Sequence, residues 1–317
     1  MPASARKCSP PAGKRPLAYT ASGAAALMDG RPARRSLPRA ADVCLLVIDP
    51  QLDFHDADRS SKRGKGSLAV RGATADSKRT AALLKRHGDR ISRVVVTLDT
   101  HHKNHICHSC FWTDSNGQHP PPFTQITAAQ VKSGAWTPVQ REMRAWAVVY
   151  CEKLEAGKKF KHTIWPDHCL LGTPGHAVEP TLQAALDEWA QSQQSTITWL
   201  LKGQNCKTEM YSALSAEVPV PGDASTRLNK PLINSLTSHR KVLVCGQAKS
   251  HCVNQTFRDL ASLWPRHRMQ DLILLNNCTS PVAGFEKEAE KFEEFVRKSG
   301  CMSLRATELS KIMNETC

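Results

Sequence analysis

Five short apolar runs rich in Val, Ile and Leu constrain the fold of this chain most strongly. They lie at Val43–Asp49, Arg93–Asp99, Thr196–Lys202, Lys241–Gly246 and Asp271–Asn276. Their residues are almost continuously apolar, which is typical of strands that are covered on both faces. Segments with helical periodicity lie between or after them, at Ser77–Gly88, Pro180–Gln191, Cys252–Leu263 and Phe285–Gly300. This alternation predicts an α/β fold of three layers, with a doubly wound, mostly parallel sheet.

Two segments differ from this pattern. Residues 1–40 contain eight Lys or Arg residues but only one acid, Asp29, and they lack hydrophobic periodicity. Such a composition predicts a disordered basic extension, with an organellar transit peptide as the alternative. The remainder, 41–317, is expected to form one domain. Within it, residues 111–162 combine a Pro run with several Lys residues, and we expect an inserted lid segment over one end of the sheet.

Composition excludes several classes of protein. No apolar run approaches the roughly 18 residues of a membrane-spanning helix, so no membrane association is expected. Half of the net charge of +14 lies in residues 1–40, and nucleic-acid binding is therefore not expected from the rest. The twelve Cys residues are scattered and no secretory signal is present, which favours a reducing, intracellular location. The cytoplasm is favoured, with organellar targeting by residues 1–40 as the alternative, and a homo-oligomer is left open.

Reactive side chains follow four of the predicted strands. Asp49, Asp99 and Lys202 end three of them, and Cys252 follows the fourth at the start of a predicted helix. Ligands of open parallel sheets bind at this edge. The helix N-terminus is expected to lower the thiol pKa of Cys252, making it a candidate nucleophile, with Asp49 as its proton carrier. Lys202 is expected to keep Asp49 ionised. A buried cysteine that merely begins a helix is the structural alternative.

A second cluster begins at Asp99 and contains metal-ligating side chains. Asp99, His101 and His105 can bind a divalent cation through oxygen and nitrogen, and His168 is a fourth candidate ligand. A structural zinc knuckle is the competing hypothesis, with the ligands His105, Cys107, His108 and Cys110. Histidines without any metal are a further alternative.

Six motifs, in order along the chain, resemble those of the isochorismatase-like cysteine hydrolases, and among them the nicotinamidases. Asp49, Gln51, Asp53 and Phe54 resemble the motif D-x-Q-x-D-F, and Asp99, His101 and His105 resemble the metal loop. The other matches lie at Gly66–Ala73, Trp165–Gly175, Lys202–Ala213 and Gly246–Val253. Together they extend from about Val43 to Leu304, and their joint occurrence is far more specific than any one of them.

The resemblance implies an isochorismatase-like hydrolase fold and a site. It implies a catalytic triad of Asp49, Lys202 and Cys252, and an oxyanion hole from the amides of Ala248 and Cys252, with a cis peptide bond before Ala248. Phe54, Trp165 and Tyr211 would enclose a substrate ring. Asp99, His101, His105 and His168 would hold one divalent metal ion, with zinc favoured over iron, manganese or magnesium.

The implied reaction is the hydrolysis of nicotinamide to nicotinate and ammonia through a cysteine thioester, a step of NAD salvage. Another amide hydrolase of the same fold is the alternative. A catalytically silent scaffold or basic binding protein is a third hypothesis, which draws on the charge of +14 but leaves the ordered motifs unexplained.

Overall fold

The computed structural model describes residues 42–57, 64–157 and 159–313, and a six-stranded sheet forms its centre. The strands are β1 (Val43–Ile48), β2 (Arg93–Asp99), β7 (Thr198–Lys202), β8 (Lys241–Gly246), β9 (Leu272–Leu275) and β10 (Met302–Leu304). Neighbours pair in parallel in the order β10-β9-β8-β1-β2-β7. The five predicted strands are confirmed. The sixth, β10, was not predicted because three half-buried or exposed residues carry no readable pattern.

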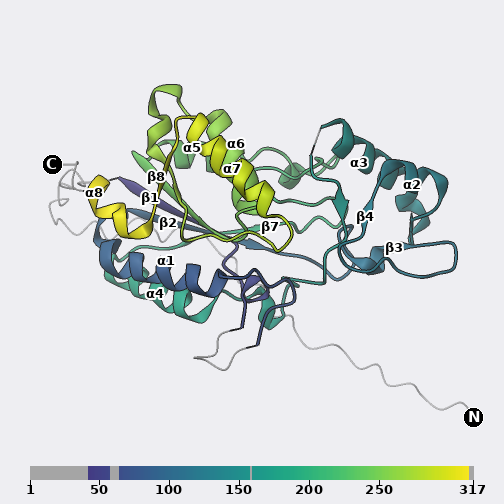
Figure 1. Cartoon of the computed structure of the whole chain (residues 1–317), viewed down its shortest axis with the longest axis horizontal. Helices are drawn as coiled ribbons and strands as arrows, with labels where there is room; N and C mark the ends of the chain where they lie inside the picture. Colours follow the sequence, from purple (N-terminus) through teal and green to yellow (C-terminus); the bar gives the residue numbers. More distant parts are fainter. Residues whose placement is uncertain (1–41, 58–63, 158, 314–317) are drawn as a thin grey trace, which may run out of the picture. The chain divides into compact units, whose positions relative to one another are not determined.

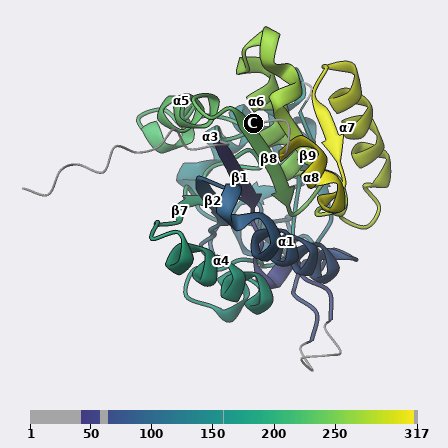
Figure 2. The same ribbon diagram turned by 90° about the vertical axis from the view of Figure 1, so that its left-hand side faces the viewer.

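Helices cover both faces of the sheet (Figures 1 and 2). One layer contains α1 (Ala73–His87), α4 (Pro180–Ser192) and α8 (Leu309–Met313). The other contains α5 (Lys230–Thr237), α6 (Cys252–Leu263) and α7 (Glu286–Lys298). The predicted doubly wound α/β architecture is confirmed. Helix α1 begins four residues before its predicted start, and α5 and α8 are additional to the prediction.

The two cores explain why the strand sequences are continuously apolar. In β1, Val43, Leu45 and Val47 pack into the core that contains α1 and α4. Cys44, Leu46 and Ile48 point to the opposite core, which contains α6 and α7. All six residues of the strand are therefore buried, as expected for a central strand of a parallel sheet.

The predicted insertion forms a small subdomain of its own. It contains β3 (Trp112–Thr113), β4 (Gln125–Ile126), α2 (Ala128–Ser133), β5 (Thr137–Pro138), α3 (Arg144–Ala156) and β6 (His162–Thr163). Two antiparallel pairs, β3 with β5 and β4 with β6, join these elements. A separate apolar core centred on Trp112, Ile126 and Tyr150 holds them together. The subdomain lies beyond one end of the strands of the central sheet (Figure 1).

Short turns of 3-10 helix complete the structure. They lie at Leu52–Phe54, Gly88–Arg90, Ser109–Phe111, Arg141–Met143, Pro174–His176, Ala224–Thr226, Arg266–Asp271 and Ala306–Glu308. Within the described ranges, no helix has the length and apolar character needed to cross a bilayer. The predicted extension at residues 1–40 lies outside the described residues.

The strand order creates a switch point between β1 and β8. From β1 the chain builds β2 and β7 on one side, and then β8, β9 and β10 on the other. Beyond the carboxyl ends of such a pair, the connections diverge and leave room for a ligand. The pair is unusually close there: Gly246 has φ of +110°, and a Cβ atom on it would lie 1.9 Å from the Ile48 carbonyl oxygen. Only glycine fits this position.

Candidate active site and metal ligands

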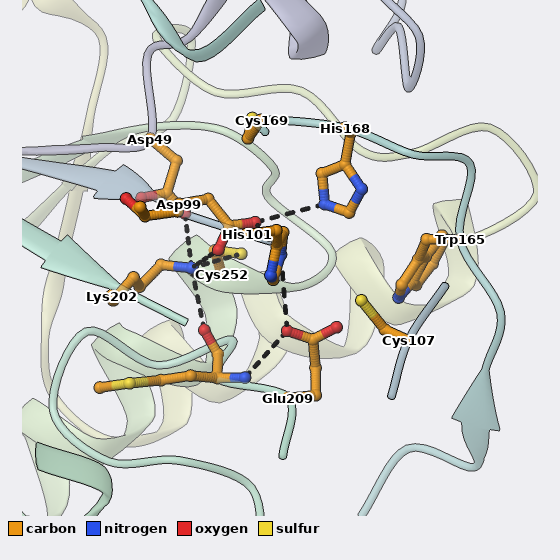
Figure 3. A network of polar contacts seen from close by, with 12 residues as sticks. Asp49, Asp99, His101, Cys107, Trp165, His168, Cys169, Lys202, Glu209 and Cys252 are labelled. Atoms are coloured by element: carbon orange, nitrogen blue, oxygen red, sulfur yellow. Dashed lines mark hydrogen bonds and ion pairs between the residues drawn. The ribbon is translucent and has the colours of Figure 1, made fainter. Parts of the chain in front are cut away.

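Lys202 brings the three predicted triad residues together at the switch point (Figure 3). Its Nζ lies 2.9 Å from Asp49 Oδ2 and 3.6 Å from Cys252 Sγ. The same ammonium also lies 3.0 Å from Asp99 Oδ1 and donates to the Met210 carbonyl oxygen at 2.9 Å. Four partners thus surround one buried cation. The sheet positions Asp49, Asp99 and Lys202, because β1, β2 and β7 end side by side.

Asp49 is held firmly at the end of β1. Its Oδ1 accepts a hydrogen bond from Thr97 Oγ1 at 2.5 Å, and its amide donates to the Thr97 carbonyl oxygen at 3.1 Å. Its φ of +43° is rare for a residue other than glycine, although Asp tolerates it better than most. Strained backbone conformations of this kind are found most often at functional sites, where the surrounding structure holds the residue in place. Thr97 was not among the predicted site residues, because a threonine inside a strand carries no functional signal.

Burial dominates the acid-base properties of the triad. It raises the pKa of Asp49, and Asp99 raises it further, although Lys202 opposes both. Lys202 therefore favours the ionised form of Asp49, as predicted, but the desolvation of this fully buried carboxyl sets the net direction of the shift. Burial likewise raises the pKa of the Cys252 thiol well above its usual value, contrary to the lowering expected at a helix N-terminus. The resting thiol is protonated.

The nucleophile candidate sits where backbone amides converge. Cys252 is the first residue of α6, and the Gln247–Ala248 peptide bond before it is cis, as the resemblance implies. Within the described part of the chain, the amides of Ala248 and Cys252 donate no hydrogen bond. Two free donors beside a sulfur atom are what an oxyanion hole requires.

Three of the four predicted metal ligands form one compact group. The Nε2 atoms of His101 and His168 lie 3.1 Å and 3.3 Å from Asp99 Oδ2. His168 Nδ1 lies 2.8 Å from the Pro166 carbonyl oxygen, which fixes its proton on Nδ1 and leaves the Nε2 lone pair for a cation. Gly203 makes room for the group, since a Cβ atom there would approach Asp99 Oδ1 to 3.0 Å. These donors fit a divalent metal ion.

Asp99 carries the negative charge of this metal-ligand group, and cationic side chains surround it. Although burial opposes it, the positive charges of His101 and Lys202 hold the pKa of Asp99 well below its usual range. Asp99 is therefore ionised. Its Oδ1 faces the ammonium of Lys202, and its Oδ2 faces the imidazoles of the metal-ligand group. The carboxylate couples the triad to the metal ligands.

The fourth predicted ligand, His105, lies in a different group. Its Nδ1 faces the Cys107 sulfur at 2.9 Å, and His101 completes that group. The alternative zinc knuckle is not assembled: of its four residues, only His105 and Cys107 belong to a candidate metal group in the described part of the chain. Cys110 instead hydrogen-bonds to the Lys103 carbonyl oxygen.

Glu209 is a site residue that the sequence did not reveal. It is buried beside the metal ligands, with Oε1 at 4.0 Å from His101 Nε2, and its Oε2 has no hydrogen-bond partner in the described structure. Its amide donates toward the Tyr150 hydroxyl at 3.3 Å. The nearest sequence signal was its place just before Tyr211 in a matched motif, but a lone Glu in a loop normally indicates an exposed residue.

An aromatic cavity opens onto the Cys252 sulfur. Its walls include the three predicted ring-binding residues, Phe54, Trp165 and Tyr211, together with His168, Ala248 and His251. Trp165 Nε1 donates to the Tyr211 hydroxyl at 3.0 Å, so these two walls support each other. His251, missed from the sequence, is buried among aromatic rings, and burial lowers its pKa to about 3. The cavity therefore offers a largely aromatic slot for a flat ring, with the carboxylates of Asp99 and Glu209 in its wall.

Neither a protein-family model nor a curated protein sequence matches the chain. Solved structures do. The yeast nicotinamidase is 21% identical, with a TM-score of 0.56 and coverage of 83% of this chain and 99% of that one. The nicotinamidase and pyrazinamidase of Acinetobacter baumanii is 20% identical, with a TM-score of 0.55 and coverage of 84% and 98%. PnC1 of L. infantum, solved in complex with nicotinate, is 20% identical, with a TM-score of 0.51 and coverage of 84% and 94%. The chain therefore has the α/β fold of the nicotinamidases, as its sequence motifs implied.

Proposed function

We propose that this chain is an amidohydrolase that converts nicotinamide to nicotinate and ammonia through a thioester on Cys252. The observation that carries the proposal is the single ammonium of Lys202, in contact with both Asp49 and Cys252 at the switch point of the sheet. A thiol, an acid and a cation in that arrangement supply a nucleophile, a proton carrier and charge stabilisation for acyl transfer.

The first half-reaction uses the triad. Asp49 takes the proton of the Cys252 thiol, and the sulfur forms a bond to the carboxamide carbon. The carbonyl oxygen then carries negative charge, which the amides of Ala248 and Cys252 stabilise. The C–N bond breaks as Asp49 returns its proton to the departing nitrogen, which leaves as ammonia. A carboxyl whose pKa is raised by burial is suited to accepting and releasing a proton in turn.

The second half-reaction regenerates the enzyme. Asp49 takes a proton from water, and the resulting hydroxide oxygen attacks the thioester carbon. The C–S bond breaks, nicotinate is released, and the sulfur regains a proton. Lys202 stays protonated throughout, because Asp49 and Asp99 raise its pKa well above the usual value despite its burial.

The neighbouring metal ligands and rings would provide recognition. A divalent ion held by Asp99, His101 and His168 would supply a Lewis-acidic contact for a pyridine nitrogen. Phe54, Trp165 and Tyr211 would hold the ring flat in the aromatic cavity. The ligands of two solved structures with this fold support such a substrate: the yeast nicotinamidase was determined with the inhibitor nicotinaldehyde, and PnC1 of L. infantum with nicotinate.

An ammonia-release assay tests the proposal. Metal-loaded protein is given nicotinamide, pyrazinamide, benzamide and an aliphatic amide at equal concentrations. The proposal predicts the highest kcat/KM for nicotinamide and much less for benzamide, which lacks the ring nitrogen. Equal rates on benzamide and nicotinamide would contradict recognition through that nitrogen, and preference for the aliphatic amide would favour a different hydrolase of this fold.

A further inference from the structure

A second group of metal-ligating side chains lies next to the site described above. It consists of His101, His105 and Cys107, whose ligand atoms lie within 4.8 Å of one another. All three residues are essentially buried, and the rings of His101 and His105 are 4.4 Å apart. The proposed amide hydrolysis uses neither His105 nor Cys107.

The orientation of His105 favours coordination toward the sulfur. The Cys107 amide donates to His105 Nδ1 at 3.3 Å, so the lone pair of this nitrogen points toward Cys107. The sulfur itself lies 2.9 Å from the same nitrogen. The other ring nitrogen, Nε2, is buried without a hydrogen-bond partner in the described structure. The polar contacts of this imidazole are therefore on its Nδ1 side, toward Cys107.

A buried carboxylate adds negative charge to the group. Glu209 lies between His101 and Cys107 in Figure 3, and its Oε2 has no hydrogen-bond partner among the described residues. The pKa of the Cys107 thiol is raised by burial first and then by the charge of Glu209. Glu209 Oε1 accepts a hydrogen bond from the Met210 amide at 2.9 Å, but a buried carboxylate oxygen left without a partner is costly unless a cation compensates it.

We propose that His101, His105 and Cys107 form a sulfur-containing site for a thiophilic divalent cation such as Zn²⁺, Cd²⁺ or Co²⁺. Binding replaces the thiol proton by the metal: the S–H bond breaks, the proton leaves to solvent, and no electron is transferred. Two imidazoles, one thiolate and a nearby carboxylate are a typical donor set for such ions.

The new site shares His101 with the set of Asp99, His101 and His168. The two sets therefore compete for one imidazole, and the identity of the metal decides between them. Harder ions such as Mn²⁺ favour the set that contains a carboxylate, whereas thiophilic ions favour the set that contains sulfur. This inference goes beyond the proposed hydrolysis and stands without it, since it concerns cation binding alone.

Cobalt spectroscopy tests the site independently of activity. The full-length protein is stripped with a chelator and titrated with Co²⁺, and sulfur-to-cobalt charge-transfer absorption is recorded in the near ultraviolet. We expect such a band in the wild type and its loss in Cys107→Ser, a substitution of nearly equal size. The matched control is Cys110→Ser, three residues away and outside the group, which should retain the band.

A second pair of variants separates the two ligand sets. His168→Ala removes a ligand of the carboxylate set only, so it should retain the cobalt band. Cys107→Ser should weaken Cd²⁺ binding by more than the roughly tenfold typical of losing an outer-shell partner, while leaving Mn²⁺ binding within about twofold. A band that persists in Cys107→Ser, or cobalt binding to the wild type without any sulfur band, would overturn the proposal.

Discussion

The two halves of the candidate site are built on different parts of the fold. Asp49, Lys202 and Cys252 stand at or just beyond the ends of strands in a parallel sheet, whose register places them within reach of one ammonium. The metal ligands beyond Asp99 lie on loops, which single bridges hold in place, such as that between His101 and Leu170. Under the proposed function, the catalytic residues thus lie at the ends of strands of the central sheet, and the residues that recognise the substrate ring lie largely on loops.

The difference teaches how one fold can keep a reaction while changing its substrate. Strand ends tolerate few alterations, because a shift of register would move every side chain of the strand. Loops and insertions vary freely by comparison. If this division is correct, substitutions in the triad should lower kcat, and substitutions among the metal ligands should mainly raise KM.

The largest effect is expected from Cys252→Ala. Without the sulfur no thioester forms, so kcat on nicotinamide should fall by about four orders of magnitude or more. Thermal unfolding checks that the protein remains folded, and substrate binding to the variant should persist. Turnover near the wild-type rate would show that Cys252 is not the nucleophile. It would also refute the assignment of catalysis to the triad and of substrate recognition to the metal ligands.

A smaller loss is expected from Asp49→Asn. The amide cannot accept the thiol proton, so kcat should drop by about 10²- to 10⁴-fold, with KM little changed. Thr97→Val is the matched control, because it removes the hydrogen bond to Asp49 while keeping the carboxylate. A Thr97→Val variant as impaired as Asp49→Asn would indicate that positioning, and not proton transfer, is what Asp49 contributes.

The recognition half is tested by His168→Ala. Loss of this direct ligand should weaken metal binding by more than the roughly 10- to 100-fold typical of an outer-shell partner, and it should raise KM for nicotinamide with a smaller effect on kcat at saturating substrate. Metal content and steady-state kinetics are measured on the same preparation. An unchanged KM in metal-free protein would show that the ring nitrogen is recognised in another way.

A buried carboxyl outside both halves is expected to affect stability alone, with no effect on the chemistry of the site. Burial raises the pKa of Glu217 to about 7, although Lys159 lies 3.2 Å away. Because the folded state binds this proton more tightly than the unfolded state, Glu217 costs stability as pH rises from about 4.5 to 7, and the cost is complete above pH 7.

Removing this carboxyl should therefore matter only at higher pH. Relative to the wild type, Glu217→Gln should gain about 3 kcal/mol in the free energy of unfolding between pH 4.5 and pH 8. Urea unfolding at both pH values measures the difference. A gain that is independent of pH would show that Glu217 does not titrate in this range.

The sequence predicted the sheet half of the site better than the loop half, for physical reasons. Buried parallel strands have a readable pattern, and their ends must meet at one edge, so Asp49, Lys202 and Cys252 could be brought together in advance. The metal loop could not be resolved in the same way, because spacing alone does not tell which nitrogen faces which partner. His105 was therefore grouped with Asp99, whereas the structure places it against Cys107.

Two further features of the site could not be predicted from the sequence: the net pKa shift of Asp49, and the positions of Glu209 and His251. The pKa of Asp49 depends on complete burial, which outweighs its contact with Lys202, and burial of a strand end is invisible in a single sequence. Glu209 and His251 come from loops whose path is set by packing against the insertion and the aromatic residues. No local pattern marks either residue.

The most direct test of the central claim is mass spectrometry of the acyl intermediate. The metal-loaded enzyme is mixed with excess nicotinamide, quenched in acid during the first turnover, and digested for peptide mapping. The account predicts a nicotinoyl group on the peptide that contains Cys252, present in the wild type and absent in Cys252→Ala. Ammonia released in that turnover without any adduct on Cys252, or with the adduct on another cysteine, would contradict it.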